Sequence, residues 1–201
     1  MKPTNLVFTW ASWWTFLRQT LLISAWFLGS FAVTYPGVAY LERSLSGPDF
    51  QFNALIFLPH GVRIFAIWLF RHQAILPLLI AHGIHIALWG HWSPNSWLPP
   101  IAGTLSAYLA FELLRMARLN PFHVVISDRS VWGRLVLAGI LAAVLNTIIL
   151  QLTLMGYDGP HGELERVLGY VIGDVAGILL FVGVLVSVNA VRELRFKPPE
   201  G

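Results

Sequence analysis

Long apolar stretches, separated by short polar segments, run through almost the whole chain. About 20 apolar residues suffice for an α-helix to cross the hydrocarbon core of a membrane. Reading the chain for apolar length gives six stretches, with ends defined to within several residues. They are Gln19–Tyr40, Asn53–Phe70, Gln73–Trp92, Trp97–Ala117, Val131–Met155 and Val167–Val191. The pattern predicts an all-α fold, a polytopic membrane bundle of about six transmembrane helices.

The second stretch has the weakest helical pattern, because it is short and contains Pro59-His60-Gly61. Proline removes a backbone hydrogen bond inside a helix but fits its first turn. The tripeptide therefore either breaks the helix or begins it after an irregular segment. Irregular backbone at membrane depth has to be sheltered by protein or by water.

Composition supports the membrane class. The chain is 56% hydrophobic and 11% charged, whereas soluble domains are about 25% charged. The longest connection, roughly Arg118–Ser130, is too short to fold alone. We therefore expect one transmembrane domain over residues 1–201 and no soluble domain. The first apolar run has no signal-peptide cleavage site.

Several classes of chemistry are disfavoured by the sequence. Cysteine is absent, which excludes disulfides, thiolate metal sites and cysteine nucleophiles. P-loop, GxSxG, HExxH and kinase signatures are also absent. We therefore expect neither an enzyme nor a metal site. The net charge of +3 is spread over the connections, so it indicates topology and no binding of nucleic acid.

Basic residues alternate between the two sides of the predicted bundle. The N-terminal segment, the second-to-third connection, the fourth-to-fifth connection and the C-terminal segment are the basic ones. Their basic residues are Lys2, Arg18, Arg71, Arg115, Arg118, Arg129, Arg134, Arg192, Arg195 and Lys197. The positive-inside rule then predicts that both termini are cytoplasmic. We expect a multi-pass protein of the cell membrane, of the bacterial inner-membrane type.

Two residues of opposite charge lie well inside these apolar stretches, Arg63 in the second and Asp174 in the sixth. A charge near the middle of a bilayer costs about 2.5–3.5 kcal/mol on insertion scales, so such residues usually have a function. At 1.5 Å per residue, Arg63 lies roughly 14 Å from the outer end of its helix and Asp174 roughly 11 Å. We expect them within salt-bridge reach, directly or through one water.

Other polar residues fall in the same layer, at roughly 10–15 Å by the same helical rise. They are His60, His82, His85, Thr104 and Asn146. Polar groups at one depth on several helices can converge inside a bundle, where membrane proteins keep ligand sites. The sequence therefore predicts a ligand-binding polar layer in the outer half of the membrane, made by Arg63, Asp174, His60, His85, His82 and Asn146.

Each member of this layer also has a purely structural interpretation. Asn146, His82 and His85 can serve as hydrogen-bond partners between helices. His60 can bond the backbone freed by Pro59, and Arg63 and Asp174 can simply neutralise one another. Small residues at short steps in the sixth stretch favour close helix packing over ligand contact. These are Gly169, Gly173, Gly177 and Gly183.

Two short motifs resemble a known family. Phe57–Arg63 (FLPHGVR), followed by an apolar helix, Arg71 and a second apolar helix, resembles the proline-glycine element of membrane-associated sensor domains of the MASE type. Gly173–Gly177 (GDVAG) resembles that family's glycine-aspartate motif, and Asn146 fits its spacing. The resemblance covers roughly Phe57–Leu180.

The resemblance implies a sensory role. Members of the family usually have more spans and a cytoplasmic output domain, so here we expect signalling output to come from a partner protein. Arg63 stands where the family more usually has an apolar residue.

Three functions are compatible with the sequence. The first is a non-enzymatic sensory or ligand-binding module, in which a small anionic ligand enters from outside and competes with Asp174 for Arg63. The second is an accessory subunit of a larger membrane complex or transporter. The third is a b-type haem protein with His60 and either His82 or His85 as axial ligands. The first two require no cofactor, and all three have the lipid bilayer as a partner.

Overall fold

The computed structural model describes residues 10–38, 40, 44, 55–89, 93–122, 129–154 and 163–195, and all regular structure among them is helical. The elements are α1 (Trp10–Val33), η1 (Thr34–Val38), α3 (Leu58–Phe70), η2 (Arg71–Ala74), α4 (Ile75–Trp89), η3 (Pro94–Trp97), α5 (Leu98–Met116), α6 (Arg129–Leu154) and α7 (Glu163–Arg195). The predicted all-α class is confirmed. Most predicted stretches match these helices to within a few residues.

The start of α1 is the main difference in boundaries. The helix begins at Trp10, well before the predicted start at Gln19. The segment before Gln19 combines Trp13 and Trp14, both mostly exposed, with the charged Arg18. Because this segment is less apolar than the rest of the helix, the search for membrane-spanning length did not include it. A helix can nevertheless continue beyond its apolar part, since its backbone stays hydrogen-bonded.

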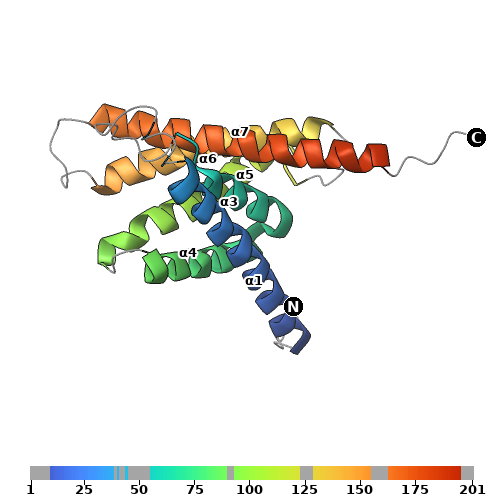
Figure 1. Ribbon diagram of the computed structural model, residues 1–201, viewed down its shortest axis with the longest axis horizontal. Coiled ribbons are helices and arrows are strands. Elements are labelled where there is room, and N and C mark those ends of the chain that lie inside the picture. Colours follow the sequence, from blue (N-terminus) through green and yellow to red (C-terminus); the bar gives the residue numbers. More distant parts are fainter. Residues whose placement is uncertain are drawn as a thin grey trace, which may run out of the picture.

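Four helical segments among the described residues are long and apolar enough to cross a membrane, which is compatible with a multi-pass membrane protein. They are Trp13–Val38, Leu58–Trp89, Ser130–Thr153 and Leu168–Val191. The second is not one straight helix, because it contains α3, η2 and α4. Arg71 at the end of α3 has a φ of 53°, and Figure 1 shows the chain turning there before α4 runs back. The helix α5 is not one of the four segments.

The helices pack so that α3 lies at the centre of the bundle. It contacts α1, α5, α6 and α7, while α1 also packs on α4, and α6 packs on α5 and α7. Figure 1 shows α6 and α7 side by side and α1 crossing the bundle obliquely. The α3 side chains Ile64 and Ile67 are fully buried together with Phe27 of α1 and Phe111 of α5.

The start of α3 depends on a close approach to α7. Pro59 lies in the first turn of α3, after the non-helical Phe57, where its missing N–H costs nothing. The Phe57 backbone N–H donates to the Gly173 carbonyl of α7 at 2.9 Å. A Cβ on Gly177 would overlap the Phe57 carbonyl oxygen. Pro59 therefore begins the helix after an irregular segment, which α7 shelters.

The glycines of α7 differ in what they do. Gly177 has the predicted packing role, and Gly61 of α3 has a similar one, because a Cβ there would lie 2.6 Å from Phe181 Cβ. Gly183 has no atom within 4 Å of a hypothetical Cβ, so the packing interpretation is wrong for that residue. Gly169 and Gly173 line the cavity described next.

Candidate functional site

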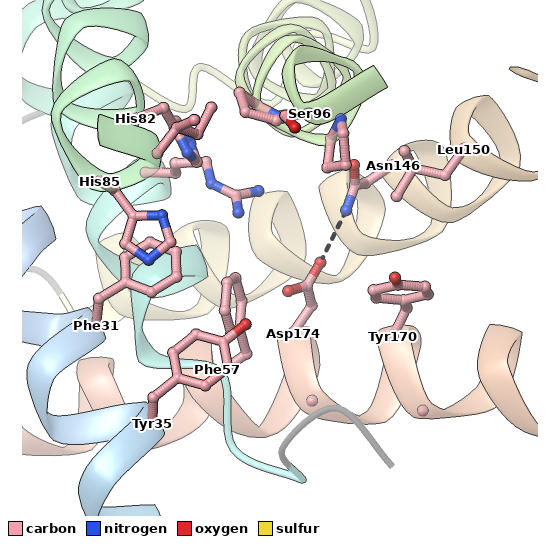
Figure 2. Close-up of a pocket in the computed structure, with 16 residues that line it drawn as sticks. Phe31, Tyr35, Phe57, His82, His85, Ser96, Asn146, Leu150, Tyr170 and Asp174 are labelled. Atoms are coloured by element: carbon pink, nitrogen blue, oxygen red, sulfur yellow. Dashed lines mark hydrogen bonds between the residues drawn. The ribbon is translucent and has the colours of Figure 1, made fainter. Parts of the chain in front are cut away.

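A cavity of about 290 Å³ lies among the helices at one end of the bundle. Its walls are Phe31, Tyr35, Phe57, Arg63, His82, His85, Ile86, Ser96, Pro99, Pro100, Asn146, Leu150, Gly169, Tyr170, Gly173 and Asp174. The C-terminal parts of α1–η1, α4 and α6 contribute, as do the N-terminal parts of α3, α5 and α7. Figure 2 shows these side chains converging from several helices.

The predicted polar layer comes together at this cavity. Arg63, His82, His85, Asn146 and Asp174 all line it. His60 does not line the cavity but lies behind Asp174, with which it is in contact. Thr104, which was expected at the same depth, is buried but is not part of the wall.

Asp174 is held on two sides through one oxygen. Asn146 Nδ2 donates to Asp174 Oδ2 at 3.3 Å (Figure 2). His60 Nδ1 lies 3.4 Å from the same oxygen, within ion-pair distance but without hydrogen-bond geometry. His60 Nε2 is 3.0 Å from the Gly139 carbonyl. Because a carbonyl only accepts, Nε2 carries a hydrogen and donates it.

Arg63 is held by packing and not by hydrogen bonds. Its side chain is 4% exposed, and its Nε and Nη1 have no hydrogen-bond partner among the described residues. Its Cζ lies 5.6 Å from the centroid of the Phe57 ring. The absence of a side chain at Gly103 of α5 makes room for the guanidinium, because a Cβ there would overlap Arg63 Nη1.

The direct ion pair between Arg63 and Asp174 is absent, and that expectation is wrong. Among the described residues, the only contacts within 4.0 Å between a carboxylate and a basic side chain are His60–Asp174 and Glu112–Arg115. On α3, His60 faces Asp174, whereas Arg63, nearly one turn later, extends over Gly103 of α5. The depth estimate placed both residues at similar depths, and both line one cavity. Depth alone did not fix the directions of their side chains. A pair bridged by water stays a prediction.

An aromatic wall completes the site and was missed by the sequence analysis. The Phe31 ring stacks on His85 at 3.9 Å between centroids and on Tyr35 at 5.6 Å. His82 meets the Phe27 ring edge-on at 4.2 Å, and its Nε2 is buried without a hydrogen-bond partner among the described residues. The spacing of Phe31 and Tyr35, four residues apart on one helix, was the available signal.

The geometry around His60 does not favour the haem interpretation. Both of its ring nitrogens already face protein groups, Gly139 and Asp174, so neither points into the cavity as an axial ligand would. Within the described ranges, no cluster of three or more His, Cys, Asp or Glu side chains could hold a metal ion.

Comparison with known proteins gives no relative: no family model, curated protein or solved structure matches this chain. The similarity to sensor domains of the MASE type stays a prediction. The feature of this chain that bears on function is the site itself, a small cavity with Arg63 and Asp174 in its wall.

Proposed function

We propose that this chain is a non-enzymatic ligand-binding module of a membrane sensor, which acts through a partner protein. The observation that carries the proposal is the guanidinium of Arg63, which is buried at the cavity with two nitrogens unpartnered among the described residues. Burying a charge without a partner is costly, and ionisable groups at membrane depth usually mark functional sites. A ligand with an anionic group offsets this cost.

The architecture supports six crossings with both termini cytoplasmic. Consecutive helices contribute alternate ends to one cavity, which is the pattern of a chain that crosses back and forth. The helix α5 also presents an apolar stripe to the outside, with about two fifths of each residue exposed. The stripe consists of Ile101, Leu105, Leu109 and Leu113. With this orientation the cavity lies in the outer half of the membrane.

Reporter fusions test this topology. Fusions after Ser46, Ser93 and Gly159 should report the outer side, and fusions after His72, Asn120 and Gly201 the cytoplasmic side, because the basic connections stay inside. The measurement is the ratio of a periplasm-active to a cytoplasm-active reporter. A consistent five-crossing pattern, with α3 entering and leaving on one side, would contradict the proposal.

A thermal-shift screen tests ligand binding by the whole chain in detergent. Small carboxylates, amino acids, phosphate and sulfate are the probes. A ligand at 100 times its Kd stabilises by about 2.7 kcal/mol, which raises Tm by about 5–11 °C for a chain of this size. The proposal expects at least one probe to do so, because an anionic group offsets the buried charge of Arg63.

Two arginine variants sharpen this screen. Arg63→Gln should abolish the shift, because it removes the buried cation. Arg115→Gln should preserve it, because Arg115 is exposed and its Nη2 contacts Glu112 at 2.5 Å at the other end of α5. The absence of a shift with every probe, or equal shifts in wild type and Arg63→Gln, would refute the role of the cavity.

The packing of α3 on α7 suggests how binding is transmitted. Arg63 belongs to α3 and Asp174 to α7, and the two helices are joined by the hydrogen bond from Phe57 to Gly173. A ligand that contacts both residues favours one relative position of these helices, and this population shift is the signal. The alternative role as an accessory subunit stays a prediction.

A further inference from the structure

We infer that the cavity binds a small zwitterion, a molecule of the amino-acid class that carries one carboxylate and one ammonium group. The inference rests on the proposed ligand-binding function and specifies its ligand. It follows from the way in which donors and acceptors are separated across the cavity.

The donors gather on the side formed by α3 and α4. Arg63 Nε and Nη1 are enclosed and have no partner among the described residues, so the guanidinium meets the cavity that it lines through Nη2. His82 lines the same cavity; its Nε2 is enclosed and unpartnered among the described residues, and it donates only in the tautomer that carries the hydrogen there. A guanidinium donates strong, charge-assisted hydrogen bonds to a carboxylate. This side of the cavity is suited to the anionic group of a ligand.

The acceptors gather on the opposite side, on α6 and α7. The contacts of Asp174 with Asn146 and His60 both use Oδ2, so Oδ1 is left for a ligand. The amide of Asn146 donates through Nδ2, and its Oδ1 is enclosed without a partner among the described residues, so Asp174 Oδ1 is the acceptor at the cavity. Figure 2 shows His82 and His85 on one side of the opening and Asn146 and Asp174 on the other. This side is suited to an ammonium group.

A ligand with one charge would satisfy only half of this site. A simple carboxylate bound to Arg63 would share a small cavity with the like charge of Asp174, and a simple amine would share it with Arg63. Because the two side chains form no direct ion pair, a zwitterion can lie between them and neutralise both. At about 290 Å³ the cavity is at the lower limit of ligand pockets, which suits a molecule of the size of an amino acid.

The walls between the carboxylate site at Arg63 and the ammonium site at Asp174 are suited to the apolar part of such a ligand. Phe31, Tyr35 and Phe57 lie on one side, and Leu150 and Tyr170 line the wall near Asp174. Aromatic faces also attract an ammonium group through their quadrupole. The cavity therefore offers a carboxylate site, an ammonium site and an apolar surface within one enclosure.

A matched set of probes tests the inference on the whole chain in detergent. Glycine, β-alanine, γ-aminobutyrate, alanine, leucine and phenylalanine are each compared with the carboxylate that lacks the amino group and with the amine that lacks the carboxylate. At least one amino acid should raise Tm with an apparent Kd at least tenfold lower than that of either of its two analogues. This comparison uses only the wild-type chain, so it does not depend on the folding of any variant.

Two variants then test which residue binds the carboxylate of the ligand and which binds its ammonium group. Asp174→Asn keeps the shape of the side chain and removes its charge. It should raise the apparent Kd of the best amino acid at least tenfold and leave the Kd of the matched carboxylate unchanged or lower. Arg63→Gln should weaken the binding of both the amino acid and the matched carboxylate. Arg115→Gln is the surface control and should change neither.

The remaining outcomes separate the two proposals. Equal binding of amino acids and matched carboxylates would overturn the zwitterion inference and leave the ligand-binding function intact. The absence of any shift with all of these probes would overturn the zwitterion inference, and the absence of a shift with phosphate and sulfate as well would overturn both proposals.

Discussion

Gly177→Ala is expected to lower the free energy of unfolding by about 1–3 kcal/mol, the usual cost of forcing extra atoms into a packed interior. The new Cβ would overlap the carbonyl oxygen of Phe57, which is backbone and cannot rotate away. The start of α3 would have to move off α7, and the hydrogen bond from Phe57 to Gly173 would lengthen or break. Thermal unfolding in detergent measures the effect, at about 2–4 °C in Tm for each kcal/mol.

Gly183→Ala is the matched control on the same helix. No atom lies within 4 Å of a Cβ placed there, and alanine is favoured over glycine in a helix by about 1 kcal/mol. This variant should therefore be neutral or slightly more stable than wild type. Equal loss of stability in the two variants would show that the α3–α7 contact is not as close as described.

Asp174→Ala is expected to be the most destabilising single change at the site, by about 3–5 kcal/mol, the usual cost of removing one member of a buried charged group. It would leave Asn146 Nδ2 and His60 Nδ1 facing a void and Arg63 without a counter-charge at the cavity. Unfolding by heat or denaturant in detergent, compared with wild type, gives the magnitude.

Double-mutant cycles show which neighbour Asp174 depends on. Residues in contact usually give coupling energies of about 0.5–3 kcal/mol. The cycle of Asp174→Ala with His60→Ala should fall in this range, because the two side chains are 3.4 Å apart. The cycle with Arg63→Ala should give a smaller coupling energy, because no contact within 4.0 Å joins that pair. A larger coupling energy with Arg63 than with His60 would indicate a direct ion pair between Arg63 and Asp174.

The sequence could predict helices and depth because both follow from simple geometry. Apolar length located the helices, and a constant rise per residue placed Arg63 and Asp174 at similar depths. Both were then found on one cavity with His82, His85 and Asn146. The role of Pro59 was also among the expected alternatives, since proline is compatible with few positions in a helix.

The contacts within the site could not be predicted, because they depend on helix rotation and side-chain direction. In a membrane protein, lipid-facing and interior positions are both apolar, so hydrophobic periodicity is weak. Phe31 is 6% exposed and lines the cavity, whereas Val33, two residues later, is 53% exposed. Both residues are apolar, so the sequence alone does not distinguish the one that lines the cavity from the one that faces outward. The space for the guanidinium at Gly103 is equally invisible until α5 is placed beside α3.

The shortness of α3 has a consequence for the space inside the bundle. Its 13 residues span only about 20 Å at 1.5 Å per residue, whereas α6 has 26 residues and α7 has 33. The helix begins beside the cavity, so its longer neighbours enclose a volume that α3 does not fill. A longer helix in this position would occupy that volume, so the cavity exists because the central helix starts late.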